Sequence, residues 1–215
     1  MKKLFKSISV KRVITFFALF AYFAIFASVN VWANRPIGIV SDIHGNVFLS
    51  KDKQTKMLKV GDHITDLSEI RTEVGAQISF SDYHDHRYHL SGQGQIKIMN
   101  KTIELYQGYL WAQSSHPEAQ AIIQTVNSSI DYGKGELIIS FDSYTKKSQV
   151  LVLNGTAQFS NIFDANKSMK LTEGQFSYIQ KNKNYGLPRN AARVGFSSFK
   201  KITTLFRGIK PLSKL

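Results

Sequence analysis

The chain has 215 residues and no cysteine, which excludes disulfide bridges, thiolate metal sites and cysteine catalysis. A hydrophobic content of 43% excludes a disordered chain. The formal net charge is +13, but every acid lies within residues 34–173, so the basic excess belongs to the two ends and the middle is nearly neutral. We therefore expect no nucleic-acid partner.

Residues 1–33 are typical of an export signal. A short basic start precedes an uncharged apolar run over residues 13–29. Val31 and Ala33 then occupy the third and first positions before a cleavage site. The apolar run is also long enough to span a bilayer, so an uncleaved signal anchor is the alternative. In both cases the basic start stays inside, and the rest of the chain is expected outside the cytoplasm.

Short apolar runs rich in Ile, Val, Phe and Tyr characterise residues 34–182. Many alternate with a period of two, as Ile78 does with Phe80, which indicates strands with one buried and one solvated face. The pattern predicts an all-β domain, either a small β-solenoid or a sandwich of many short strands. The expected strands are residues 47–49, 77–80, 95–99, 102–106, 109–112, 121–126, 136–141, 149–153 and 175–179.

Scattered glycines separate these runs. Glycine adopts the positive φ angles of tight turns at no steric cost, so these positions are expected to shape hairpins. None of them opens a helix, and a phosphate-binding loop is therefore not expected. The predicted turn residues are Gly61, Asp62, Gly108, Gly155 and Gly174.

The basic tail, residues 183–215, departs from the strand pattern. Its apolar residues step by three or four, which predicts a short amphipathic helix with a cationic face. Such a helix suits an anionic membrane surface. The alternative is a helix that caps the open end of the β domain and covers exposed strand edges. The candidate membrane-facing residues are Phe196, Phe199, Lys200, Lys201, Ile202, Phe206 and Arg207.

Residues 82–89 form the densest polar cluster of the sequence. His84, His86 and His89 lie within it, and imidazole is a ligand for zinc, copper or nickel. His84 and His86 would share one face of a strand, whereas His89 would face away. A metal site at these histidines is one hypothesis, and a low-pH sensor is another. The alternative is a solvated hairpin tip with ordinary histidines.

One stretch imitates an enzyme motif. Residues 41–46, with Asp42 and His44, are similar to the first metal motif of metallophosphoesterases, and residues 60–66 partly match the second. No Gly-Asn-His motif follows, and the chain lacks the alternation of strands and helices that carries such a site. We therefore expect no enzyme, no catalytic residue and no cofactor.

The pattern of strand residues and glycines resembles the FecR domain family over residues 36–180. Residues 56–82 are similar to the first half of that domain. The stretches 107–110, 149–155 and 171–175 follow in the order of its second half. The matching residues of the first half are Val60, Gly61, Asp62, Ile64, Ile70, Thr72, Ile78, Phe80 and Asp82.

The resemblance implies a non-enzymatic domain that acts by protein contact in envelope signalling or scaffolding, with an envelope protein as its partner. FecR regulators also carry a cytoplasmic domain that handles a sigma factor, but only a short basic stretch precedes the apolar run here. That anti-sigma role is not expected of this chain on its own. A periplasmic metal- or ligand-binding module that uses residues 84–89 is the alternative function.

We expect the exported protein to begin at Asn34, because Val31 and Ala33 fit a signal-peptidase site. Intact mass spectrometry of the protein recovered from the cell envelope measures this. A mass that still includes residues 1–33 would identify an uncleaved anchor instead.

Overall fold

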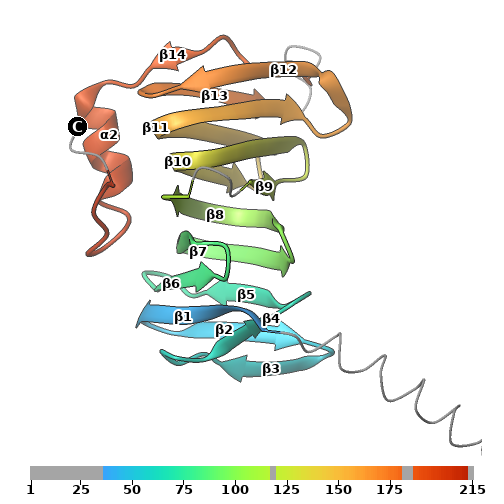
Figure 1. Cartoon of the computed structure of the whole chain (residues 1–215), viewed down its shortest axis with the longest axis vertical. Helices are drawn as coiled ribbons and strands as arrows, with labels where there is room; N and C mark the ends of the chain where they lie inside the picture. The colour runs from blue at the N-terminus through green and yellow to red at the C-terminus, as the bar shows by residue number, and fades with distance from the viewer. Residues whose placement is uncertain (1–35, 117–119, 181–185, 213–215) are drawn as a thin grey trace, which may run out of the picture. The chain divides into compact units, whose positions relative to one another are not determined.

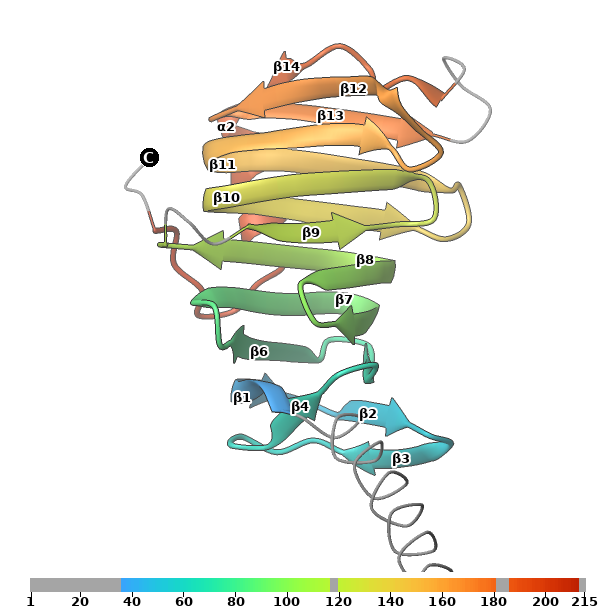
Figure 2. The ribbon, with the colours of Figure 1, turned by 45° about the vertical axis from the view of Figure 1, so that its right-hand side comes forward.

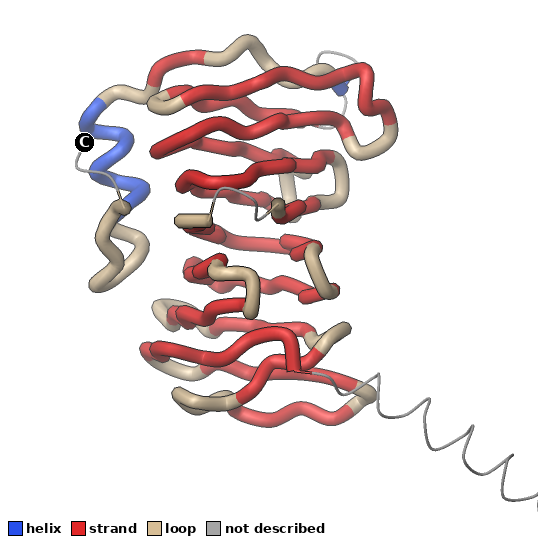
Figure 3. The backbone as a smooth tube through the Cα atoms, in the orientation of Figure 1, coloured by secondary structure: helices blue, strands red, loops and turns tan. Residues whose placement is uncertain are grey.

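The computed structural model describes residues 36–116, 120–180 and 186–212, so the expected export signal lies outside the described residues (Figure 1). The described residues form β-strands almost throughout, with one short α-helix near the C-terminal end (Figure 3). The expected all-β class and the expected C-terminal helix are both confirmed.

The strands follow one another with short connections. The shorter strands of the first half are β1 (Pro36–His44), β2 (Val47–Lys51), β3 (Gln54–Met57), β4 (His63–Thr65), β5 (Glu69–Thr72) and β6 (Gln77–Asp82). The later elements are β7 (His86–Met99), β8 (Thr102–Ser114), β9 (Ala121–Gln124), β10 (Ser128–Asp142), β11 (Lys147–Asn161), β12 (Asp164–Thr172), β13 (Gln175–Gln180), β14 (Ala192–Arg193) and the helix α2 (Phe196–Thr203).

The strands stack in nearly the order of the sequence (Figure 2). The main path is β14-β13-β11-β10-β9-β8-β7-β5-β2-β3, and β1, β4, β6 and β12 pair beside it. All pairings are antiparallel except that between β8 and β9. Most consecutive strands form hairpins, because antiparallel neighbours need only short connections.

Four long strands, β7, β8, β10 and β11, each belong to two layers. The first half of β7 pairs with β6 and its second half with β5, just as the first half of β11 pairs with β13 and its second half with β12. Layer A comprises β1, β6, β13 and β14 with residues 86–91, 109–114, 135–142 and 147–153. Layer B comprises β2, β3, β5, β9 and β12 with residues 95–99, 102–107, 128–132 and 156–161.

The main hydrophobic core lies between the two layers. Side chains from both halves of each long strand belong to one buried cluster, so the bent strands enclose a single core. Its fully buried members include Leu90, Leu110, Ile139 and Val152 from layer A and Ile96, Leu105, Ile130 and Phe159 from layer B.

Paired glycines mark the points at which the long strands change layer. A Cβ atom on Gly108 would lie 2.6 Å from the Cα atom of Gly94, and its φ is +93°. A Cβ atom on Gly155 would lie 2.7 Å from the carbonyl oxygen of Lys134 and 3.1 Å from the Cα atom of Gly135. The backbones of neighbouring strands therefore touch at each corner, and only glycine fits there.

The glycine corners correct one expectation from the sequence. Gly61 and Gly174 lie in connections between strands and have positive φ, as expected of turn residues. Asp62 closes the first of these turns by accepting a hydrogen bond from the backbone N–H of Lys59 at 3.2 Å. Gly108 and Gly155 also have positive φ, but they bend β8 and β11 instead of ending them. The expected strands 102–106 and 109–112 are thus one strand, because β8 pairs with β7 on both sides of the bend at Gly108.

Alanine at a corner glycine should cost more stability than alanine at a turn glycine. Gly108→Ala and Gly155→Ala combine a strained φ with overlap against backbone atoms, so we expect each to lower the free energy of unfolding by about 3 kcal/mol or more. Gly61→Ala and Gly174→Ala are matched controls, because their φ is also positive but nothing lies within 4 Å of the added atom. These should lose only about 1–2 kcal/mol in urea unfolding. Equal losses in all four variants would contradict the role of close approach.

Candidate functional site

The outer face of layer A is buried although it faces away from the core. Leu151 and Leu153 point outward from β11 while Val150 and Val152 point into the core, and all four are buried. A second hydrophobic cluster therefore covers this outer face. The expectation that each strand has one solvated face is wrong here, because the C-terminal segment covers the second face.

The C-terminal segment first returns along β13. The backbone N–H of Arg189 donates to the carbonyl oxygen of Tyr178 at 3.0 Å, and that of Val194 donates to the carbonyl oxygen of Gly174 at 3.0 Å. The chain then forms α2 and continues into residues 205–212, which we call the hook. Figure 1 shows α2 and the hook together on one side of the strand stack.

Helix α2 lies loosely on layer A. It begins after Gly195 without a side-chain cap, and none of its residues is fully buried. Phe199 and Ile202 are half-buried against the outer cluster, whereas Phe196 is 80% exposed. No helix within residues 36–116, 120–180 and 186–212 is long and apolar enough to cross a membrane.

The expected membrane-facing side of this helix is wrong in part. Phe199, Ile202 and Phe206 pack against the outer face of layer A, which removes their apolar surface from water. The exposed members of the expected set are Phe196, Lys200, Lys201 and Arg207. The alternative of a cap is closer to the structure, but the segment covers a sheet face rather than strand edges.

Phe206 anchors the hook in the outer cluster. Its side chain is 3% exposed, and its ring lies edge-to-face against the ring of Trp111 with 5.3 Å between centroids. An aromatic pair in this geometry contributes about 0.5–1.5 kcal/mol beyond burial of its area. Ile138 and Leu153 complete the buried surroundings of the two rings.

Side chains of layer A hold the main chain of the hook. The amide Nε2 of Gln77 donates to the carbonyl oxygen of Arg207 at 3.1 Å, and the backbone N–H of Arg207 donates to Oε1 of Gln77 at 2.8 Å. The hydroxyl of Ser91 donates to the carbonyl oxygen of Leu205 at 2.8 Å. After Gly208, whose φ is +73°, the hook turns back toward β8 and β10.

Glu136 is the centre of the polar contacts beyond this turn. Its Oε1 accepts hydrogen bonds from Nε1 of Trp111 and Nε2 of Gln113, both at 2.7 Å, and its Oε2 accepts one from the backbone N–H of Leu212 at 2.9 Å. Nε2 of Gln113 also donates to the carbonyl oxygen of Lys210 at 3.1 Å. The Glu136 side chain is 0% exposed, so these donors replace water around its carboxylate.

His89 supports the same group of side chains from β7. Its Nε2 donates to Oε1 of Gln113 at 3.2 Å, since the amide nitrogen of Gln113 is already donating to Glu136. Its Nδ1 accepts from the hydroxyl of Ser79 at 2.8 Å. Burial lowers the pKa of His89, and the charge of Arg87 adds to this lowering. The ring is thus held neutral beneath the hook.

The three candidate metal ligands do not converge. His86 is buried on the inner face of β7, where its ring contacts Tyr88 and Tyr132 and its Nδ1 lies 2.8 Å from Oδ2 of Asp82. His89 is buried on the outer face, and His84 is exposed in the turn before β7. The expected solvated hairpin tip is therefore wrong for His86 and His89, because β7 begins earlier than the sequence suggested. Within the described part of the chain, no group of three or more His, Asp or Glu residues is placed to hold a metal ion.

The enzyme-like motif is also dispersed. Asp42 and His44 lie on β1, where Nδ1 of His44 is 3.1 Å from Oδ2 of Asp42 and both side chains are about half exposed. Asp62 instead binds Nζ of Lys56 at 3.2 Å. The residues that imitate metallophosphoesterases thus serve separate surface contacts.

A cleft of about 430 Å³ separates α2 from layer A. The floor is apolar, formed by Ile138, Leu151 and Phe176, while Arg193 and Ser198 bring polar groups to its lining. Its size and character are within the range of sites that accept a small ligand or a side chain. The cleft shows that α2 leaves part of the outer face of layer A unfilled.

Sequence reasoning missed Gln77, Gln113 and Glu136. A signal was present, because Gln113 shares the outward parity of Trp111 on β8, and Glu136 shares that of Ile138 on β10. Polar residues in register with outward apolar ones indicate a covered face that needs hydrogen bonds. The identity of the covering segment, however, depends on contacts across 76 to 130 residues of sequence.

Comparison with solved structures finds a similar fold in a bacterial protein. Two crystal structures from Parabacteroides distasonis, at 2.50 and 1.65 Å resolution, carry the description "putative anti-sigma factor" and match this chain with a TM-score of 0.52. The sequence identity is 12%, and the match covers 61% of this chain and 62% of the other, which is less than two thirds of that chain. The likeness is one of fold alone. No family model and no curated protein matches the sequence.

Lowering the pH should destabilise the protein through His89. Because burial lowers its folded-state pKa, the ring stays neutral in the folded protein while the unfolded chain takes up a proton below about pH 6.5. The free energy of unfolding is therefore highest above about pH 6.5 and falls as the pH drops toward the folded-state pKa, by at most about 1.4 kcal/mol per pH unit. Urea unfolding at a series of pH values measures this slope.

Two variants isolate the contribution of His89 to that slope. His89→Gln should remove it, since glutamine does not titrate, whereas His84→Gln should keep it because His84 is exposed. Equal slopes in the wild type and both variants would contradict the assignment to His89.

Proposed function

We propose that this chain is an exported, non-enzymatic protein that acts by contact with another envelope protein, in signalling or scaffolding. The observation that carries the proposal is its fold likeness to the Parabacteroides protein described as a candidate anti-sigma factor. A protein of that description works by binding another protein. Export is proposed from the basic start and apolar run of residues 1–33.

The positions of the FecR-like residues support this proposal. Gly61 and Asp62 form the turn before β4, Ile70 and Thr72 lie in β5, and the stretch 78–82 ends β6. Each therefore has a role in a strand or a turn, as a family pattern of strands and glycines requires. Membership in the FecR family itself belongs to the proposal.

The buried polar groups of layer A also favour a contact function. Gln77, Ser91, Gln113 and Glu136 are used to hold another segment of polypeptide. Their bonds satisfy donors and acceptors of a main chain, which is the chemistry of protein association. The fold thus already makes one interface of the kind the proposal requires.

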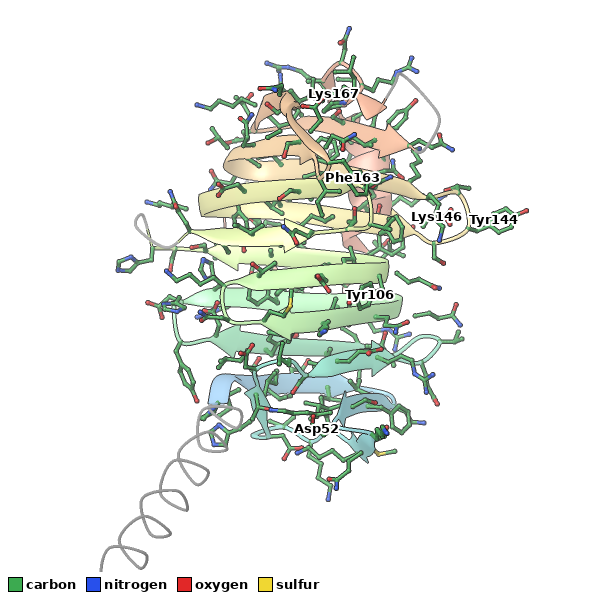
Figure 4. All side chains as sticks on the ribbon, turned by 90° about the vertical axis from the view of Figure 1, so that its right-hand side faces the viewer. Asp52, Tyr106, Tyr144, Lys146, Phe163 and Lys167 are labelled. Atoms are coloured by element: carbon green, nitrogen blue, oxygen red, sulfur yellow. The ribbon has the colours of Figure 1, made fainter. Side chains whose placement is uncertain are left out.

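Exposed aromatic residues offer a contact surface elsewhere. Tyr144, 95% exposed, lies in the turn between β10 and β11, and Phe163, 82% exposed, lies in the turn between β11 and β12. Figure 4 shows these two and Tyr106 on the side of the β domain that lies away from α2. Aromatic side chains at an interface contribute disproportionately to binding energy.

Photo-cross-linking in the native cell tests the proposed function. A photoreactive phenylalanine analogue at Tyr144 or Phe163 should give a discrete adduct with one envelope protein, which mass spectrometry identifies. Leu187, 46% exposed, is the matched control and should give no such adduct. If no adduct forms from either aromatic position at native expression levels, the contact function proposed for this surface is wrong.

A further inference from the structure

The contacts between layer A and the hook share one property. Each of the four side chains on layer A binds main-chain groups of the hook, and none binds a hook side chain. These side chains come from four different strands, β6, β7, β8 and β10. The polar side chains involved are Gln77, Ser91, Gln113 and Glu136. Such contacts recognise the main chain of a polypeptide segment, with little regard to its side chains.

The contact at Gln77 illustrates this recognition. Its amide donates to the carbonyl oxygen and accepts from the N–H of the same residue, Arg207. A neighbouring strand would satisfy a residue of an antiparallel sheet in the same way. The side chain of Arg207 itself is exposed, so the two bonds to Gln77 do not depend on that side chain.

The surface selects a particular kind of side chain at one position of the hook. Among residues 196–212, Phe206 is the one with a fully buried side chain, and it fills the space beside Trp111. The carboxylate of Glu136 is buried at the far end of the hook, and among the described residues its hydrogen-bond partners are uncharged donors. An occupant with an aromatic residue and basic rather than acidic neighbours fits this surface.

The helix that leads into the hook is held loosely. Helix α2 has no fully buried residue, starts without a side-chain cap and leaves the cleft of about 430 Å³ beneath it. Layer A below it is continuous, with its strands paired on both sides. Segments with few buried contacts open at lower free energy than the sheets on which they lie.

We infer that the outer face of layer A is a peptide-binding surface that the hook occupies in cis, and that a partner protein occupies it with an aromatic–basic segment that turns as Phe206–Lys210 does. This inference rests on the proposed contact function and names a second surface for it. The hook itself is the template, because its main chain and its aromatic anchor show what the surface accepts, while its flanking cations suit the negative charge of the buried Glu136. Displacement of the hook by the partner frees α2, whose Lys200 and Lys201 are already exposed, for further contacts.

Peptide binding to a variant with a weakened hook tests the inference. The probe is a fluorescent synthetic peptide of residues 203–212, and the protein is the full chain carrying Phe206→Ala. Anisotropy should show saturable binding at least tenfold tighter than to the wild type, whose own hook competes for the surface. A peptide with alanine in place of its phenylalanine should bind at least tenfold more weakly.

Two matched variants define the surface. Met57→Ala removes an exposed apolar side chain of β3, far from the hook in sequence, so this protein should bind the peptide as weakly as the wild type does. Gln77→Ala, added to Phe206→Ala, removes both hydrogen bonds to residue 207 and should weaken peptide binding at least fivefold. No saturable binding to a folded Phe206→Ala protein would overturn the inference.

Hydrogen exchange of the wild type decides the case in which Phe206→Ala does not fold. The amide protons of Arg207 and Leu212, which bind Gln77 and Glu136, should exchange at least tenfold faster than those of Val150 and Val152 in β11. Equal protection would mean that the hook opens only when the whole domain unfolds, and would overturn the inference. A wild-type dimer that the peptide dissociates would assign the surface to a second copy and would overturn the partner named here.

The two proposals can fail separately. Cross-linking from Tyr144 or Phe163 reports on the side away from α2, and peptide binding reports on layer A. An envelope adduct without peptide binding would keep the contact function and reject the peptide-binding surface.

Discussion

Close approach of backbones at the paired glycines is the constraint on which the structure depends. At Gly94 and Gly108, and again at Gly135 and Gly155, two neighbouring strands turn together from one layer into the other. Strands that ended there would form two separate ladders, each with its own exposed face. Because the strands bend instead, both layers enclose one core, and the stretch that follows Gly135 enters layer A with Glu136 on its outer face.

The sequence determined the fold class through local patterns. Alternation at pairs such as Ile78 with Phe80 predicted strands, and the spacing of phenylalanines after residue 195 predicted the helix. Local patterns could not distinguish a glycine that ends a strand from one that bends it, since both have positive φ and both interrupt an apolar run. That difference depends on whether the backbone of the neighbouring strand comes close at the same position, as that of Gly94 does beside Gly108.

The candidate site could not be predicted from the sequence, for a related reason. Gln77 binds Arg207 across 130 residues, and neither residue belongs to a motif that announces the contact. The histidine cluster, by contrast, was conspicuous in sequence, yet β7 sends His86 into the core and His89 to the outer face. Clustering along the chain predicts proximity only where the backbone is not extended, because successive residues of a strand point to opposite sides. Parity with Trp111 was the signal that would have identified Gln113.

The burial of both faces of β11 has a consequence for folding during synthesis. Val150 to Leu153 form a continuous apolar stretch whose outward half is covered, among the described residues, by a segment that is synthesised after every strand. Until that segment has been synthesised, layer A exposes an apolar sheet face. Exposed apolar surface makes folding intermediates prone to aggregation. Maturation therefore ends with a local closing step, and the time between completion of β13 and arrival of Phe206 is the interval in which a holdase or a neighbouring chain competes for the sheet.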